Sequence, residues 1–288
     1  MTPRLLSAAV NVSALPKDDH KYETIAGRAF VKGAGDASDI DPNDVAQGGL
    51  GDCYFLSAAA AVARANPELI RRLIKQVGPH AYEVTLYGED HFWSSSTPHK
   101  FVVSDQFATD GHGHAVYAQP GDVGREGPEL WVMLLEKAFA TMKGSSKALE
   151  GGLGSTGLGL LLQGGGKDYQ TGDYTPDQLM KLINDAMHAH LPVTTGTGVV
   201  ISNGASLLDE LKAKHPSLPD WFISKEKERQ LAAMAKVGAV QPHEYSIASI
   251  DLKTRHVKIQ NPWGFAHLDL SFEDYKAAFT EFSIGAAQ

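Results

Sequence analysis

The chain has 288 residues, of which 43% are hydrophobic, so it is long enough to form one large domain or two lobes around a sizeable core. Its net charge of −8 comes without a Lys/Arg block long enough to follow a phosphate backbone, which argues against nucleic acid as a partner. The single cysteine excludes an internal disulfide. No apolar run approaches the roughly 18 residues of a membrane-spanning helix, so we expect no membrane span.

Residues 1–25 are interpreted as an N-terminal extension. Their brief apolar patch is interrupted by Asn11 and is shorter than the core of a typical signal peptide. Together with the cysteine content, this predicts a cytoplasmic protein, or one exported without a recognisable signal peptide as an effector or toxin module. We expect a monomer.

The lone cysteine, Cys53, follows a glycine-rich turn and opens an alanine-rich segment. Gly48, Gly49 and Gly51 precede it, and the composition of residues 53–65 predicts a helix that begins at the cysteine. Unpaired N–H groups in the first turn of a helix favour negative charge, so we expect them to lower the pKa of the thiol from its usual value of about 8.5. This position suits a nucleophile; the alternative is a small buried apolar residue, the commoner role of a free cysteine.

The next segments are predicted to be a helix and a few strands. Apolar residues recur at helical spacing over residues 67–77. Residues 82–87 and 101–104 are rich in β-forming residues and flank a turn cluster at residues 94–96. The first half of the chain is therefore expected to be mainly helical with a short β section.

A buried helix and a glycine-rich stretch follow. Residues 129–140 are hydrophobic nearly all round, which predicts a buried helix that ends near Gly144. Residues 151–166 are the most glycine-rich stretch and include a literal G-x-G-x-x-G at residues 152–157. A dinucleotide site needs a strand before this motif, whereas a helix precedes it here, so we interpret the stretch as a flexible crossing between lobes that lines a cleft.

The second half is predicted to be richer in strands. A helix is expected over residues 177–189 with Pro176 near its start, and a strand begins in residues 191–195. The charge run at residues 224–229 is interpreted as part of a mobile loop or a short helix.

A hairpin near the C-terminus predicts a partner for a catalytic histidine. Residues 244–251 and 255–261 are β-like runs joined by a short polar connection. With a three-residue loop, position 245 lies opposite Asn261, and His243 is then a diagonal neighbour of Asn261 on the same face, about 7–8 Å away along the backbone. An imidazole held by an amide is the base of a Cys–His–Asn triad, which would serve Cys53.

The other histidines have simpler explanations. His112 and His114, like His188 and His190, are separated by one residue, but the first pair lies in a glycine-rich loop and the second in an expected helix. We therefore expect no metal site at either pair. Most of the remaining histidines are expected on the surface.

Five blocks, in order between residues 44 and 264, resemble segments of the calpain family of cysteine proteases. Residues 47–56 look like its Gln-Gly-x-Leu-Gly-Asp-Cys-aromatic signature, residues 243–247 resemble its His-Ala-Tyr-Ser-Val segment, and residues 261–264 match its Asn-Pro-Trp-Gly box. Residues 129–138 and 148–152 are similar to its helix and glycine loop.

The resemblance implies an α+β, papain-like fold of two lobes. A mainly helical lobe at residues 26–155 would carry the nucleophile, and a β-rich lobe at residues 156–288 would carry the histidine and the asparagine. No EF-hand loop or C2-like β-sandwich follows the last block, so we expect a protease core alone.

The resemblance also assigns catalytic roles. Cys53 would be the nucleophile, His243 the base and acid, and Asn261 the residue that orients the imidazole. Gln47 would donate a side-chain N–H to the oxyanion hole. The implied reaction is endopeptidase cleavage of a protein or peptide substrate through a thioester acyl-enzyme.

Further residues are expected to bind the substrate. Gly151 and Gly152 would offer backbone groups to an extended peptide, and Trp263 would shield the His–Asn contact from water. Pro242 stands where the family usually has glycine, so a carbonyl remains for the substrate but the loop is stiffer and lacks an N–H. Tyr54 stands where tryptophan is commoner.

Calcium is a possible activator, although the chemistry itself requires no cofactor. Asp44 and Glu129 resemble acidic ligands of the calcium site in the first lobe of conventional calpains; they could equally be helix-end or salt-bridge carboxylates. The segment at residues 265–270 lacks the acidic pattern of the second-lobe site, so we expect no second site.

Two alternatives remain open. A catalytically silent calpain-like binding module would keep the cleft without turnover. A papain-fold amidase or transglutaminase-like acyl transferase would share the triad but act on another acceptor.

Overall fold

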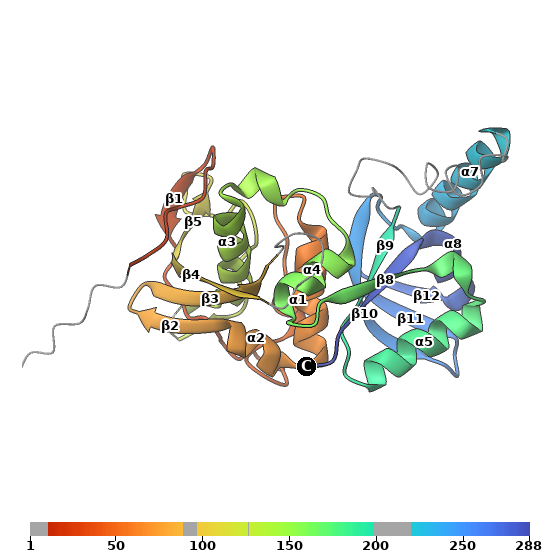
Figure 1. Ribbon diagram of the computed structural model, residues 1–288, viewed down its shortest axis with the longest axis horizontal. Helices are drawn as coiled ribbons and strands as arrows, with labels where there is room; N and C mark the ends of the chain where they lie inside the picture. Colours follow the sequence, from red (N-terminus) through yellow and green to blue (C-terminus); the bar gives the residue numbers. More distant parts are fainter. Residues whose placement is uncertain (1–10, 89–96, 126, 199–219) are drawn as a thin grey trace, which may run out of the picture.

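Two separate hydrophobic cores organise the chain (Figure 1). The computed structural model describes residues 11–88, 97–125, 127–198 and 220–288, without the side chains of residues 220–227. One core collects buried residues between Ile40 and Leu162, and the other collects buried residues between Leu179 and Ile284. The fold is α+β and consistent with the papain-like class, as expected; the predicted turn cluster at 94–96 lies outside the described residues.

Helices and a small antiparallel sheet enclose the first core. The helices are α1 (Cys53–Ala65), α2 (Pro67–Leu73), α3 (Trp131–Lys143) and α4 (Gly154–Leu161), with the 3₁₀ helices η1 (Pro42–Asp44) and η2 (Ser146–Leu149). The sheet has the order β2 (Ile74–Gly78), β3 (Ala81–Tyr87), β4 (Pro98–Ser104). Two short pairs are β1 (Lys21–Thr24) with β5 (Gln106–Thr109), and β6 (Val123–Gly124) with β7 (Gly127–Pro128).

Helices α1 and α3 form the centre of this lobe. Helix α1 begins at Cys53, as the sequence predicts, and ends where Pro67 opens the next helix. Helix α3 ends at Gly144, which takes the left-handed conformation with φ 78° that favours glycine. The Phe139 ring of α3 lies 4.9 Å, between centroids, from the Phe55 ring of α1. Burial of these apolar faces therefore fixes α1 in place.

A six-stranded antiparallel sheet dominates the second lobe (Figure 1). Its order is β12 (Leu268–Ser271), β11 (His256–Gln260), β10 (His243–Asp251), β9 (Val193–Thr197), β13 (Glu281–Gly285), β8 (Gly166–Gln170). The helices of this part are α5 (Pro176–His188), α7 (Asp220–Val237) and α8 (Phe272–Ala278), with the 3₁₀ helix η3 (Thr171–Asp173). Helices α5 and α8 pack on each other and on the strands, which buries the second core.

The predicted hairpin exists, but its loop differs from the expectation. Asp251 pairs with His256 rather than residue 255, so the loop has one residue more than we expected. A β-bulge between Ile247 and Ser249 then inserts one extra residue, Ala248, on the β10 side. The two deviations compensate, because beyond the bulge Ile247 pairs with Ile259 in the register that the sequence predicted.

Two predictions of local structure are wrong. The expected helix 67–77 stops at Leu73, because residues from Ile74 onward pair with β3 and become strand β2. The expected flexible crossing at 151–166 contains helix α4 instead. A Cβ added at Gly157 would lie 2.3 Å from the carbonyl oxygen of Tyr54, so this glycine allows α4 to pack directly on α1.

The expected lobe boundaries fall within packed elements. The boundary at 155/156 lies inside α4, whose leucines belong to the first core, and the expected extension 1–25 contains β1, which pairs with β5. The charge run at 224–229 is part of the 18-residue helix α7 rather than a loop or a short helix.

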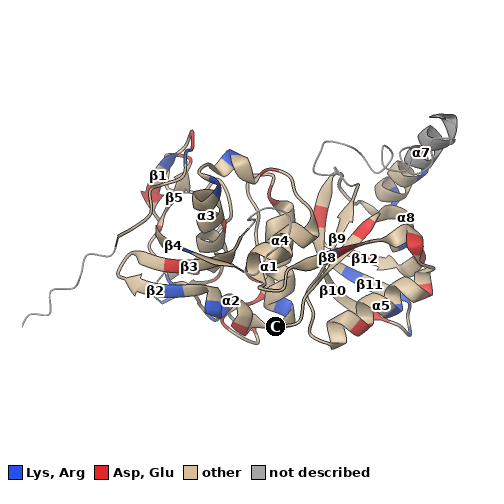
Figure 2. Ribbon diagram, viewed as in Figure 1, with Lys and Arg blue, Asp and Glu red and all other residues tan. Residues whose placement is uncertain are grey.

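Acidic and basic residues are interspersed along both lobes (Figure 2). Within the described part of the chain, none of the helices combines the length and the apolar character that crossing a membrane requires.

We predict that Phe139→Ala will destabilise the protein by about 3–5 kcal/mol, because the ring is fully buried against α1 and its removal leaves a cavity. Urea unfolding monitored by circular dichroism measures this change. Leu252→Ala, at a side chain that is 49% exposed on the hairpin loop, is the control and should change the free energy of unfolding by less than about 0.5 kcal/mol. Equal effects of the two substitutions would contradict the packing described here.

Candidate active site

Cys53 is the first residue of α1, and Asp52 is its N-cap. The Asp52 side chain makes no capping hydrogen bond, but its carbonyl oxygen accepts from the backbone N–H of Phe55 at 2.9 Å. Cys53 as a residue is half-buried, and the backbone N–H of Glu244, on β10, faces its thiol. The nucleophile predicted from the sequence thus lies where a helix of the first lobe meets a strand of the second.

The structure contradicts the expected low pKa of this thiol. Burial raises the pKa of Cys53 to about 12, and the nearby carboxyl groups of Glu244 and Asp52 add to the rise. The backbone N–H groups of Glu244 and Tyr54 oppose it only in part. Desolvation of the thiolate therefore outweighs the helix N-terminus in this arrangement.

His243 and Asn261 are in direct contact, as the hairpin predicts. His243 Nε2 lies 2.9 Å from Asn261 Oδ1, and the backbone N–H of Trp263 donates to the same oxygen at 3.1 Å. Because this amide oxygen only accepts, Nε2 must carry the proton, which leaves Nδ1 as the basic nitrogen. Burial lowers the pKa of His243, and the hydrogen bond to Asn261 partly offsets this decrease.

Aromatic rings enclose the imidazole. The Trp263 ring lies 4.8 Å from it and the Tyr245 ring 4.6 Å, both measured between centroids. Asn261 is 1% exposed, so the hydrogen bond to His243 is kept from water. The expected shielding role of Trp263 agrees with its position.

A cleft of about 810 Å³ contains most of the predicted site residues. The predicted residues that line it are Gln47, Cys53, Gly151, Gly152, Pro242, His243 and Trp263, whereas Asn261 lies behind the histidine. Within the described residues no hydrogen bond joins Cys53 to His243, so the two groups share a cleft without being paired.

Comparison with known proteins identifies the family of this site. The family model described as calpain family cysteine protease matches residues 31–283. The chain belongs to the calpain family. It is 29% identical over 268 residues to the calpain-type cysteine protease ADL1 of Oryza sativa subsp. japonica, which covers 91% of this chain and 11% of the relative. It is 26% identical over 254 residues to human calpain-9, which covers 85% of this chain and 31% of the relative.

The chain spans only a fraction of the length of its calpain relatives. The calpain-type cysteine protease DEK1 of Arabidopsis thaliana is 30% identical over 235 residues, which are 79% of this chain and 9% of that protein.

The Gln47 side chain is turned toward its own loop in this member of the calpain family. Its amide nitrogen donates to the Leu50 carbonyl at 2.5 Å and lies 3.3 Å from Asp52 Oδ1. Gln47 Oε1 is buried and has no hydrogen-bond partner among the described residues. To bind the oxyanion of a substrate, the Gln47 side-chain N–H would therefore have to leave one of these two acceptors.

A buried carboxyl pair, to which the sequence analysis assigned no role, lies beside this loop. The carboxyl group of Asp52 lies close to that of Glu136 of α3, which accepts from the backbone N–H of Ala118 at 3.0 Å. Burial raises the pKa of Asp52 to about 7, and burial together with Asp52 raises that of Glu136 well above its usual value. The sequence feature that could have revealed this pair is a charged residue, Glu136, within a helix that is otherwise apolar nearly all round.

Specific contacts hold the glycine loop at Gly151 and Gly152. Gly151 has φ 78° and donates its N–H to the Gly51 carbonyl at 2.9 Å. A Cβ added at Gly152 would lie 2.6 Å from the Tyr54 ring. Tyr54 therefore lies directly under the loop.

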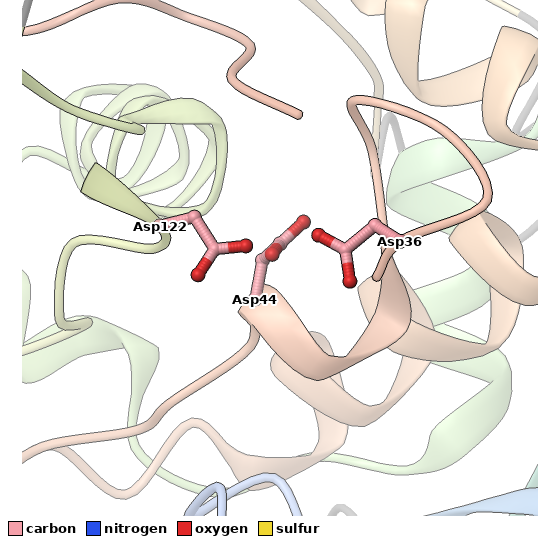
Figure 3. A group of neighbouring side chains, drawn as sticks. All are labelled: Asp36, Asp44 and Asp122. Carbon is pink, nitrogen blue, oxygen red and sulfur yellow. The ribbon is translucent and has the colours of Figure 1, made fainter. Parts of the chain in front are cut away.

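Four carboxyl groups gather at the predicted calcium site. Oxygens of Asp36, Asp44 and Asp122 all lie within 4.8 Å of one another, and Figure 3 shows these three side chains converging. The carboxyl group of Glu129 lies beside that of Asp44, and its Oε2 is buried without a hydrogen-bond partner among the described residues. Burial, with Asp44, raises the pKa of Glu129 to about 10. Oxygen donors in this number fit Ca²⁺, and the sequence had indicated only Asp44 and Glu129.

We predict that Cys53 will react slowly with iodoacetamide near neutral pH and faster as the pH rises. The reason is that the thiol pKa is raised and no hydrogen bond pairs the thiol with His243. Mass spectrometry of the calcium-free protein from about pH 5 to about pH 10 measures the rate at this single cysteine.

The urea-unfolded protein is the control, because its thiol should titrate near the ordinary value of about 8.5. Rapid alkylation of the folded protein that persists down to about pH 5 would instead demonstrate a preformed thiolate–imidazolium pair.

Proposed function

We propose that this chain is a cysteine endopeptidase in which Cys53, His243 and Asn261 act as the catalytic triad. The observation that carries the proposal is the 2.9 Å contact between His243 Nε2 and Asn261 Oδ1, in the wall of the cleft that Cys53 also lines. Asn261 fixes the tautomer in which Nδ1 is free to accept a proton. That nitrogen is the one a base needs for the Cys53 thiol.

The reaction would follow the covalent route of cysteine nucleophiles. Nδ1 of His243 accepts the thiol proton, and the thiolate attacks the substrate carbonyl carbon. The tetrahedral intermediate collapses when the imidazolium protonates the leaving amine, which gives a thioester on Cys53. Water, deprotonated by the same imidazole, then attacks the thioester and releases the acid.

Stabilisation of the oxyanion would come from the start of α1. The backbone N–H of Cys53 is at the first position of the helix, where donors lack intrahelical partners. Gln47 would add its amide N–H after it leaves the Leu50 carbonyl. Asp52 and Glu136 support this loop as positioning residues.

The triad is tested by cleavage of casein with and without calcium. We expect Cys53→Ala and His243→Ala each to lower kcat/KM by at least about a thousandfold, because each removes a member of one catalytic unit. His256→Ala, at an exposed histidine of β11, is the matched control and should retain activity. A thiol-directed inhibitor should label Cys53.

Cleavage by Cys53→Ala at the parent rate would reject this mechanism. Labelling of Cys53 without cleavage of any protein would favour the silent binding module instead, and release of ammonia or amide transfer to an amine would favour the amidase or transglutaminase alternative.

We also infer that calcium binds to the carboxylates of Asp36, Asp44, Asp122 and Glu129. The inference is supported by their mutual distances and by the buried, unpartnered oxygen of Glu129. Bound calcium would neutralise carboxylates next to η1, nine residues before the nucleophile, and so favour an ordered loop between them.

We predict that millimolar CaCl₂ will raise the melting temperature of the protein by a few degrees, since a ligand of the folded state stabilises it. Differential scanning fluorimetry against MgCl₂ and a chelator measures the shift. Asp44→Asn and Asp122→Asn should abolish it, whereas Glu83→Gln, at a carboxylate paired with Lys100 on β4, should not. An identical shift in all variants would place calcium elsewhere.

A further inference from the structure

Two glutamates face the same point of the six-stranded sheet. Glu244 of β10 and Glu281 of β13 both lie directly opposite Gly196 of β9, the strand between them. Residues in direct register on neighbouring antiparallel strands project on the same side of the sheet. The two carboxyl side chains therefore flank a position that has no side chain of its own.

The absence of a side chain at Gly196 allows the two carboxyl groups to approach each other. A Cβ added there would lie 2.5 Å from Glu244 Oε2 and 2.7 Å from Glu281 Oε1, so the carboxyl oxygens occupy that space. A Cβ added at Gly154 of α4 would lie 2.4 Å from the other oxygen, Glu244 Oε1. Glycines above and below thus make room for the carboxyl group of Glu244.

Glu244 is buried without adequate compensation. It is 4% exposed, and its Oε1 has no hydrogen-bond partner among the described residues. Burial and the charges of Glu281 and Asp168 raise its pKa well above the usual value. Thr194 lies beside it and offsets this rise only in part, since neither Glu244 Oε1 nor Thr194 Oγ1 makes a hydrogen bond of normal geometry.

The glutamate pair belongs to the catalytic cleft. Both residues line it together with Cys53 and His243, and Glu244 directly follows the catalytic histidine in the chain. The charge of Glu244 reaches the nucleophile, because it contributes to the raised pKa of Cys53. Figure 2 shows acidic segments on the strands of this sheet. Glu244 and Glu281 are the acidic residues of its strands that line the cleft.

A purely structural role explains Glu244 poorly. Its buried carboxyl group has an oxygen without a hydrogen bond, which costs stability, and an apolar side chain could pack at this position. A cation that arrives from the cleft offsets the cost, because it pairs with the Glu244 carboxylate next to the negative charge of Glu281. The part of the substrate nearest to His243 is the segment around the scissile bond.

We propose that Glu244 and Glu281 form an acidic subsite, which binds a lysine or arginine side chain of the substrate close to the scissile bond. This inference rests on the proposed peptidase function and deepens it, since it names a class of peptide that the cleft selects. A guanidinium or ammonium group would lie between the two carboxylates above Gly196. Any proton shared by the pair leaves to solvent when the cation binds.

The first test is a set of fluorogenic peptides that carry Arg, Lys, Leu or Glu at each position on either side of the scissile bond. At one position we expect kcat/KM for Arg or Lys to exceed that for Leu by about tenfold or more. Glu244→Gln and Glu281→Gln should each reduce this ratio, and Glu244→Ala should shift the preference toward Leu by enlarging an uncharged pocket.

Glu150→Gln is the matched control, since Glu150 is an exposed carboxylate on the other wall of the same cleft. It should leave the Arg/Leu ratio unchanged. An equal loss of the ratio in Glu150→Gln would assign the preference to the general negative potential of the cleft and overturn the proposal. A parent protein that cleaves Leu and Arg peptides equally would also overturn it.

A binding measurement separates this inference from the peptidase function. Calorimetry with the full-length Cys53→Ala protein compares an Arg-containing peptide with its citrulline analogue, which keeps the shape and removes the charge. Preference for arginine that disappears in Cys53→Ala/Glu244→Gln supports the subsite even if the parent protein cleaves nothing. Equal affinity for the two peptides rejects the subsite even if the parent protein is an active peptidase.

Discussion

The β-bulge at Ala248 determines which face of the sheet carries His243. Successive residues of a strand point to opposite faces, so a shift of one residue between β10 and β11 would move the imidazole away from Asn261. The hairpin loop has one residue more than the three-residue connection expected from the sequence, and the bulge removes its effect before the strand reaches the cleft. The hydrogen bond between His243 and Asn261, and the tautomer that it imposes, follow from this compensation.

Direct contacts between the lobes bring that histidine to the nucleophile helix. Ser57 of α1 donates to the Glu244 carbonyl at 2.8 Å, and the backbone N–H of Gln47 donates to the Pro262 carbonyl at 2.7 Å. Arg64, near the other end of α1, hydrogen-bonds to Gln260 of β11. Both strands of the His–Asn hairpin are therefore tied to the helix or loop that carries Cys53, while the thiol and the imidazole remain unpaired. In the proposed peptidase, the two groups would pair by a rearrangement within the one cleft that they already share.

Buried acidic groups surround this cleft at a cost in stability. Asp52 and Glu136 lie beneath the start of α1, and Glu244 lies beside the histidine with an unsatisfied oxygen. Of these groups, Glu244 and Asp52 raise the pKa of Cys53 as long as no cation compensates their charge. A bound cationic substrate would reverse that influence, because its charge compensates the carboxylates nearest to the thiol. Substrate selection and thiol activation are then linked through the same electrostatic interaction.

Local sequence was sufficient to predict the elements whose determinants are local. The start of α1 at Cys53, the end of α3 at Gly144 and the contact of His243 with Asn261 follow from glycine positions, apolar spacing and strand parity. The strand β2 was missed because its pairing with β3, rather than its own composition, ends helix α2. Helix α4 was missed because its glycines, which weaken an isolated helix, allow close packing on α1.

The sequence by itself determined the family, the residues of the proposed triad and the acidic residues available for a cation. Only the tertiary structure decided which of these groups meet. It joined Asp36 and Asp122 to Asp44, placed Glu244 and Glu281 on either side of Gly196, and turned the Gln47 amide toward its own loop. It also decided the pKa of the thiol. Burial depends on what packs around Cys53, and its effect on the pKa outweighs that of the helix N-terminus that the sequence supplies.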